Sequence, residues 1–553
     1  MKRIDKFLDA EWKQNVFLFL IIVLAYLPVL VAPKTVNPDA QLIIPLLKSV
    51  HSFSDYYEML FNFETYDVQP IRDLTFFVDI FFFNKFHFNS FIYQNILFWI
   101  IACITVKKSL SLIFPSFSRN QCFYLACLFA IYPLFCGTLC WGIARKHILS
   151  FLFIMLSTLF LFKILKKTGK KKYQVILINV FYVLSVFSQP ITLLWPFWAL
   201  AYVFLNFRQE IKKIGIYLTP ALIVFSIGVY VNTLYYDQSL VFKMNFESKT
   251  SDAFNIPDKI LGLGHYIYQL FLPYWQATAY QLGHWSVWIG ILLMGVFSLI
   301  YLSLKLDKTW LLSWFGFIMF PLALILSNPH ILSDNYLVTP SFGLLVLVGT
   351  LLNKNEKVKN FFFTYGFYTL LLGWSFYTYH ESKLWTDTLR YSEIRNFERR
   401  PNCDSAMNVV RKYYAIKGYA PNAAKDYLVR FQCFHPSLTV ASGALSYIYI
   451  QTILNYYEKE ISLENKIIAI SKVANFYYYP KLVLAVLYIE SKREREGELL
   501  INEVYKDHDK ISWIDHYDLI LANKLEPYCK RTNNLECLRI TSHFNYVPDV
   551  PYY

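Results

Sequence analysis

The chain has 553 residues, of which 56% are hydrophobic, 19% are aromatic and only 17% are charged. In soluble proteins about a quarter of all residues are charged, so this composition argues against a soluble globular chain. Apolar runs of roughly 17–25 residues recur along the sequence, and this is the length that crosses a bilayer as a helix. The composition therefore predicts an all-α, polytopic helical membrane protein.

The formal net charge of +14 raises the question of nucleic-acid binding. The basic residues, however, are concentrated in short loops between the apolar runs, as in the cytoplasmic loops of membrane proteins. These loops contain Lys107–Lys108, Lys163–Lys172, Arg208–Lys213, Lys305–Lys308 and Lys354–Lys359. We therefore interpret the charge as a topology signal and expect no nucleic-acid partner.

The apolar runs predict about eleven spans. They cover residues 15–32, 90–106, 121–138, 147–166, 174–188, 191–206, 215–233, 286–304, 309–327, 337–353 and 361–379. No cleavage site clearly follows the first run, so we expect it to be a retained span with the N-terminus in the cytoplasm. This arrangement places every basic loop on the cytoplasmic side and everything after Tyr379 outside.

Two segments need a separate interpretation. Residues 76–89 are apolar but interrupted by charged and polar side chains, which favours an amphipathic helix at the membrane surface. Ser188-Gln189-Pro190 separates two short spans, and its proline indicates either a tight outward turn or a kink.

The low glycine content, with 18 glycines, and the abundance of Lys, Ile and Phe suggest an AT-rich bacterial genome. The expected location is the bacterial inner membrane.

The composition changes after His380, so we predict a membrane domain over 1–380 and a helical periplasmic domain over 381–553. The second domain carries many charges, no long apolar run and helix-period patterns. Pro401 and Pro436 lie about one tetratricopeptide period of 34 residues apart. We interpret this domain as a degenerate tetratricopeptide-like array of helical hairpins. A generic helical domain is the alternative.

The second domain contains four cysteines: Cys403, Cys433, Cys529 and Cys537. An even number outside the cytoplasm permits two disulfides, with three possible pairings. Cys529 and Cys537 are close enough in sequence to bridge across a helix hairpin, and Cys403 could meet Cys433 about one repeat later. Free, buried thiols are equally compatible with the sequence.

The chain has no nucleotide-binding glycine loop, HExxH, CxxC or GxSxG motif, so we expect neither a cofactor nor a metal site. A polar loop from Pro33 to Thr75 follows the first span instead. Its carboxylates are Asp39, Asp55, Glu58, Glu64, Asp67 and Asp73. An acidic loop, outward basic residues and an apolar interior suit a lipid-phosphate substrate, whose tail lies among helices and whose phosphate needs cations.

An ordered set of short segments resembles the motifs of integral-membrane O-mannosyltransferases with tetratricopeptide tails. The family patterns are "RPLT…gyH", "HP…WxxGRKDxL", "SKP…P", "P…Y", "DRYxYxPxxG" and a Trp before the tail. The corresponding segments are Gln69 to Gln94, Tyr132-Pro133 with Trp141 to Leu149, Ser188-Gln189-Pro190 with Pro196, Leu272-Pro273 with Tyr280, Asp334-Asn335-Tyr336 with Pro340 to Gly343, and Trp385 with Asp387. The chain departs from these patterns at Asp73, Gln94, His147, Gln189 and Asn335.

The resemblance implies a GT-C glycosyltransferase fold and an inverting enzyme. Such an enzyme takes a sugar, for example mannose, from a polyprenyl-phosphate carrier and places it on a protein hydroxyl or a surface glycan outside the cytoplasm. The expected partners are the polyprenyl-phosphate sugar, the acceptor and membrane lipids. One alternative is a glycan ligase or polymerase that uses a diphosphate-linked carrier. Another is a non-catalytic membrane scaffold whose tail binds partners.

Under this interpretation Asp39 is the catalytic base that deprotonates the acceptor hydroxyl. Its structural alternative is an N-cap of a following helix, a common role for Asp. Arg145 and Lys146 would hold the carrier phosphate. The alternative for Arg145 is a side chain that extends to the membrane interface.

Four further residues are candidates in the same site. Arg72 would also bind the phosphate, or would simply pair with Asp73 or Asp67. Asp73, Asp334 and His147 are supporting candidates. Asp334 would orient a neighbouring cation, and His147 would occupy the interface or accept a hydrogen bond.

Overall fold

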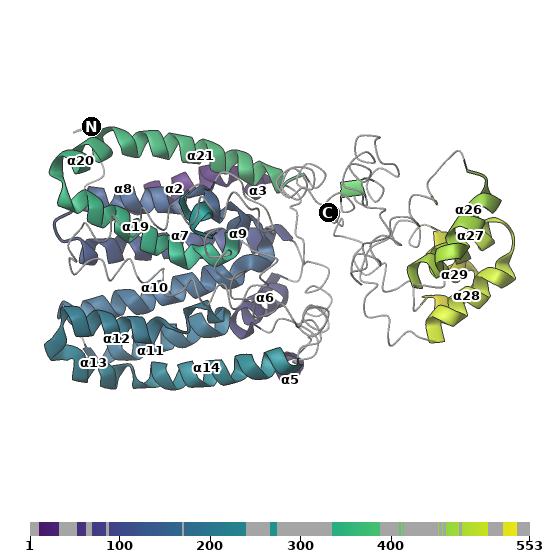
Figure 1. Ribbon diagram of the computed structural model, residues 1–553, viewed down its shortest axis with the longest axis horizontal. Coiled ribbons are helices and arrows are strands. Elements are labelled where there is room, and N and C mark those ends of the chain that lie inside the picture. Colours follow the sequence, from purple (N-terminus) through teal and green to yellow (C-terminus); the bar gives the residue numbers. More distant parts are fainter. Residues whose placement is uncertain are drawn as a thin grey trace. The chain divides into compact units, whose positions relative to one another are not determined.

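The structure is a computed structural model in which every described element is a helix (Figure 1). No strand occurs within the described ranges, so the all-α prediction is confirmed for them. The chain divides into two compact units; the described residues up to Asp387 belong to the first, and those from Val409 onward to the second. The described residues are 10–32, 52–61, 69–83, 88–168, 171–238, 266–271, 273, 334–387, 409–410, 413, 452, 456, 461–474, 478–506 and 524–538.

The first unit is a bundle of long helices (Figure 1). Its principal helices are α2 (Glu11–Ala25), α3 (Leu27–Val31), α7 (Phe88–Ile113), α8 (Arg119–Ala130), α10 (Arg145–Leu165), α11 (Lys171–Ser188), α12 (Trp195–Asn206), α13 (Ile211–Tyr217), α14 (Thr219–Gln238), α19 (Val338–Lys354), α20 (Glu356–Phe361) and α21 (Phe367–Leu384). Its shorter elements near the site are α5 (Phe53–Phe61), α6 (Pro70–Phe83), α9 (Cys136–Cys140), η2 (Gly142–Ala144), η3 (Pro190–Thr192) and η6 (Asp334–Leu337).

Helices α10 and α11 pack side by side and run in opposite directions. Ser157 Oγ on α10 donates to the carbonyl of Ile178 on α11 at 2.9 Å. Further toward the start of α10, the carbonyl of Ser150 accepts from Ser185 Oγ, near the end of α11, at 2.8 Å. The two helices are therefore antiparallel, as expected for helices joined by a short connection.

Three segments of the described chain are long and apolar enough to cross a membrane: Phe91–Ile113, Arg145–Leu165 and Asn335–Lys354. Two bent pairs raise the number to five if each counts as one span. They are Arg119–Ala130 with Pro133–Cys140, bent by 45°, and Arg208–Tyr217 with Thr219–Tyr230, bent by 58°. The predicted spans 286–304 and 309–327 lie outside the described residues, and the predicted number of about eleven stays a prediction.

The Ser188-Gln189-Pro190 segment is a turn rather than a kink. Helix α11 ends at Ser188, and η3 begins at Pro190. Beyond this point Trp195 Nε1 donates to Thr158 Oγ1 at 3.0 Å, and the Tyr202 ring contacts the Phe162 ring with centroids 5.5 Å apart. Helix α12 therefore follows α10 in the same direction and reverses α11.

The amphipathic helix predicted over residues 76–89 begins earlier, at Pro70. Proline has no N–H to satisfy and its φ is already helical, which favours the first position of a helix. The Asp73 carboxylate accepts from the N–H of Gln69 at 3.0 Å, and the N–H of Asp73 donates to the Gln69 carbonyl at 2.9 Å. These bonds satisfy groups that a helix start otherwise leaves without partners.

Most of the basic residues described in the first unit lie in or next to the turns at one end of the bundle, where α13 and α20 lie in Figure 1. Lys107 Nζ, near the end of α7, donates to Asn15 Oδ1 at the start of α2 at 2.6 Å. Ser116, between α7 and α8, bonds to Asn353 at the end of α19. Elements α3, α6 and α9 lie at the opposite end (Figure 1). The bundle thus has one basic end and one end that holds the predicted motifs.

The second unit contains α26 (Leu463–Ala474), α27 (Tyr478–Glu490), α28 (Glu494–Lys506) and α29 (Glu526–Thr532). Helices α26, α27 and α28 pack consecutively through short connections. Gly497 allows the close approach of α28 to α27, since a Cβ there would lie 3.0 Å from the Ala485 carbonyl oxygen. This arrangement is that of helical hairpins, and the tetratricopeptide assignment stays a prediction. Residues 401–408 and 414–451 lie outside the described part, and the predicted boundary at 380/381 falls within α21.

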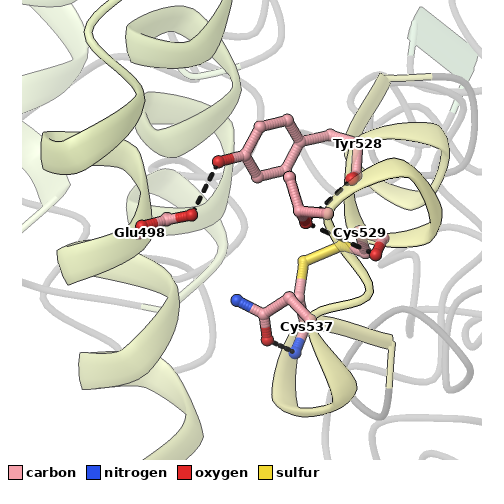
Figure 2. The surroundings of a disulfide bond; sticks show 6 residues. Glu498, Tyr528, Cys529 and Cys537 are labelled. Carbon is pink, nitrogen blue, oxygen red and sulfur yellow. Dashed lines mark hydrogen bonds between the residues drawn. A yellow bond between two sulfur atoms is a disulfide. The ribbon is translucent and has the colours of Figure 1, made fainter.

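The second unit also contains a disulfide between Cys529 and Cys537 (Figure 2). Their Cα atoms are 5.5 Å apart, within the range that a disulfide requires. The bond joins α29 to the helical turn 535–538, and Tyr528 Oη donates to Glu498 on α28 at 2.9 Å. The predicted Cys529–Cys537 pair is confirmed. Cys403 and Cys433 lie outside the described residues.

Candidate functional site

The candidate site lies at the N-terminal end of α10, where polar residues follow the apolar helix α9 and begin the apolar helix α10. Helix α9 ends at Cys140, and the single turn η2 leads directly into α10 at Arg145. The sequence Arg145-Lys146-His147 therefore forms the first turn of a long apolar helix. Several other elements converge on this turn.

Arg145 is fully buried and binds two other helices. Its Nη1 forms an ion pair of 2.8 Å with Asp79 Oδ2 on α6 and donates to Thr75 Oγ1 at 3.1 Å. Its Nε donates to Asn95 Oδ1 on α7 at 3.0 Å, and its Nη2 donates to the Phe91 carbonyl at 3.3 Å. The buried Arg145 side chain thus donates to four acceptors of the chain itself.

Asp79 is the centre of this network on α6. Its side chain is 4% exposed. While Oδ2 accepts from Arg145, Oδ1 accepts from the Nε2 of Gln94 on α7. Gln94 stands where the resembling family has a histidine, so one departure from the motif contributes directly to the polar network.

Arg72 and Asp73 form a second buried pair at the start of α6. The Arg72 guanidinium contacts Asp73 Oδ1 at 2.6 Å, and both side chains are nearly inaccessible to solvent. Tyr56 Oη donates to the Pro70 carbonyl at 2.6 Å. Burial, with a smaller contribution from Asp73, raises the pKa of the Tyr56 phenol above its ordinary value. Arg72 therefore has the pairing that its structural alternative predicts.

His147, in the same first turn of α10, contacts η6. The buried His147 ring meets the Tyr336 ring edge-on, with centroids 5.1 Å apart. Thr138 Oγ1 on α9 donates to Asn335 Oδ1 at 2.9 Å. Lys146 is half-buried. Asp334 is the first residue of η6, and its side chain lies outside the described part.

The remaining motif segments also reach this end of the bundle. Ser150 Oγ on α10 donates to the carbonyl of Gln189 at 3.1 Å. The buried Gln189 Oε1 has no hydrogen-bond partner among the described residues. Tyr132 Oη donates to the carbonyl of Leu270, next to the Leu272-Pro273 motif. Trp385 is buried just after α21.

The structure thus places Arg72, Asp73, Arg145, Lys146 and His147 on elements that converge at one end of the bundle. Asp39 lies outside the described residues. Sequence reasoning missed Thr75, Asp79 and Asn95 as members of the network. The available signal was the four-residue spacing of Thr75 and Asp79, which puts both on one face of a helix.

The described residues include no group of three or more His, Cys, Asp or Glu side chains that could hold a metal ion. No family model matches the chain, and comparisons with curated proteins and with solved structures found no match either. The resemblance to the O-mannosyltransferases therefore rests on the motifs and their arrangement.

Proposed function

We propose that this chain is an integral-membrane glycosyltransferase of the GT-C class. It transfers a sugar, for example mannose, from a polyprenyl-phosphate carrier to a protein hydroxyl or a surface glycan outside the cytoplasm. One observation carries the proposal: segments that resemble the family motifs are far apart in sequence, yet contacts join them at one end of the bundle. Arg145 binds Asp79 across 66 positions, and the His147 ring contacts the Tyr336 ring of the Asp334-Asn335-Tyr336 segment.

The membrane location is supported by the surface of the first unit. Its helices expose large apolar side chains, such as Leu24 at 60%, Ile216 at 71% and Leu372 at 71%. In water such a surface is unfavourable, whereas lipid covers it without cost. These helices supplement the three apolar segments and support the predicted topology of about eleven spans.

The orientation is supported by the two ends of the bundle and by the tail. A basic end is typical of the cytoplasmic side, which leaves the candidate site outside. The Cys529–Cys537 disulfide favours an oxidising compartment for the second unit. A bacterial inner membrane with a helical-hairpin tail in the periplasm, of the tetratricopeptide type, satisfies both conditions.

The proposed reaction is a single displacement with inversion at the anomeric carbon. The acceptor oxygen forms a bond to that carbon as the bond to the phosphate oxygen breaks. The acceptor proton passes to the Asp39 carboxylate, and the phosphate leaves as an anion that needs no general acid. Lys146 supplies positive charge near this anion, in a setting where burial strengthens electrostatic interactions.

The test uses the purified full chain in lipid nanodiscs with a polyprenyl-phosphate sugar and an acceptor peptide or glycan. The wild type should consume the donor, and Asp39→Asn should abolish consumption. Asp55→Asn is the matched control, because Asp55 lies in the same loop and accepts from the Ser52 N–H at the start of α5. Undiminished transfer by Asp39→Asn would reject the base assignment.

Two rival functions are judged in the same experiment. A ligase or polymerase would consume only a diphosphate-linked donor. A non-catalytic membrane scaffold would consume neither donor, and it is the second candidate because Asp79 and other groups of the chain already bind Arg145. A reporter that is active only outside the cytoplasm, fused after Tyr553, tests the orientation; a silent reporter would reject it.

A further inference from the structure

Helix α6 is joined to the bundle in part by a buried arginine of α10. Thr75 and Asp79 lie one helical turn apart on α6, and both bind Arg145. On the other side of the same guanidinium, the acceptors are Asn95 Oδ1 and the Phe91 carbonyl, one turn apart on α7. One side chain from α10 therefore joins two further helices.

The geometry of the guanidinium explains why this contact fixes a position. Arginine presents its N–H donors in a rigid planar fork, so acceptors on both helices must lie in set directions. Aromatic rings confine the group as well. Its carbon lies 4.5 Å from the ring centroid of Phe76 on α6 and 5.2 Å from that of Phe91 on α7. Sliding α6 along the bundle would break the ion pair and this ring contact together.

The same contacts argue against Arg145 as a ligand of the carrier phosphate. Its side chain is 0% exposed, and its partner Asp79 is 4% exposed. A phosphate that took the place of Asp79 would leave a buried carboxylate without its cation, and an unpaired buried charge is strongly destabilising. The same constraint applies to Arg72, which is 0% exposed and pairs with the buried Asp73. Lys146 is half-buried, so the argument does not exclude it as a phosphate ligand.

We propose that Asp79 and Arg145 form a latch that fixes α6 against α7 and α10, and that both are positioning residues. The latch sets the place of the polar start of α6, including Arg72, at the candidate site. Its effect on sugar transfer rests on the proposed function, whereas its effect on the position of α6 does not.

The first experiment measures the position of α6 directly. Spin labels at Val78→Cys on α6 and Leu97→Cys on α7, both exposed positions, report the distance between the helices by double electron–electron resonance. The full chain is used in nanodiscs. The wild type, which has only the native cysteines, is treated with the same spin label to measure the background labelling. The reference protein should give one narrow distance distribution, and Asp79→Asn and Arg145→Lys should each broaden or shift it.

The matched control is Glu11→Gln, which breaks the exposed pair of Glu11 and Lys108, whose atoms are 3.5 Å apart. It should leave the distribution unchanged. The latch is rejected if Asp79→Asn and Arg145→Lys also leave it unchanged.

The second experiment covers the case in which the single variants do not fold. The double variant Asp79→Leu with Arg145→Met removes both charges at once, and apolar replacement of a buried ion pair is often tolerated. We expect a broadened distance distribution and an affinity for polyprenyl monophosphate within about threefold of wild type. A loss of affinity of about tenfold or more would overturn the positioning role, because it would identify Arg145 as the phosphate ligand.

The two proposals fail in different ways. If the wild type binds no polyprenyl phosphate, the proposed function fails and the distance measurements alone decide the latch. If the lipid binds but the distances do not change in the variants, the latch fails and the proposed function stands.

Discussion

Removing the Cys529–Cys537 disulfide should destabilise the second unit by an amount that the structure allows us to work out. The two cysteines are separated by 8 residues, so the bond closes a short loop. In the chain-entropy treatment a loop of this length lowers the entropy of the unfolded chain enough to contribute about 2.5 kcal/mol at 25 °C. For a domain of 150–250 residues, 1 kcal/mol shifts Tm by roughly 2–4 °C. The double variant Cys529→Ser with Cys537→Ser should therefore unfold about 5–10 °C lower.

The assay is differential scanning calorimetry on the full chain, with hydrogen exchange of α28 and α29 to assign the transition. Tyr528 adjoins Cys529 and bonds Glu498, so exchange should rise in both helices (Figure 2). Cys103→Ser, which changes a buried free thiol of the first unit, should leave the transition of the second unit in place. A double variant that unfolds within about 1 °C of wild type would refute the reasoning, since the loop would then not restrict the unfolded chain.

Three further changes have equally definite expectations. Gly497→Val should lower the free energy of unfolding in urea by about 1–3 kcal/mol, because the new side chain on α28 meets the backbone of α27. Gly373→Val is the control, because no atom lies within 4 Å of the added Cβ, and it should not have this effect. Tyr56→Phe should raise hydrogen exchange at the start of α6, through loss of a hydrogen bond worth about 1 kcal/mol; unchanged exchange would show that this bond does not hold α6. The hydrogen bond from Arg493 lowers the pKa of Glu496 in the folded protein. The pair therefore stabilises the second unit above about pH 4.3, the ordinary pKa of a glutamate, and this stabilisation is lost as the pH falls through the lower pKa of the folded state. Glu496→Gln should flatten that acid limb in a pH series of unfolding curves, and an unchanged limb would contradict the assignment.

Local signals in the sequence account for much of the fold. Long apolar runs predicted helices close to those observed, because a helix that must bury or face apolar surroundings keeps its pattern over many residues. Proline correctly indicated the end of a helix at Pro190, where α11 ends and a turn begins. The start of α6 at Pro70 was missed, because Asp73 was interpreted as a loop carboxylate and a candidate site residue, and its role as a helix cap was not considered. The Cys529–Cys537 pair was predicted because its two members are close in sequence.

The candidate site was predictable only in part. The sequence identified Arg145 as a residue of interest, but its partners on α6 and α7 lie 50–70 positions away, and no local pattern links them. Asp79 was recognised only as an interruption of an apolar run. Whether a buried arginine binds a substrate or another helix depends on which groups the fold brings to it, and single-sequence patterns do not contain that information.

The wide separation of Asp79 and Arg145 has a consequence for biosynthesis. Asp79 leaves the ribosome 66 residues before its cation does, which at 5–20 residues per second is a wait of roughly 3–13 s. During this interval the Asp79 carboxylate on α6 has no arginine partner, and its entry into lipid would be costly. For the membrane location proposed above, we expect helix α6 to remain at the aqueous surface until α10 has been inserted, and only then to dock. A nascent chain that stalls before α10 would then expose an undocked helix.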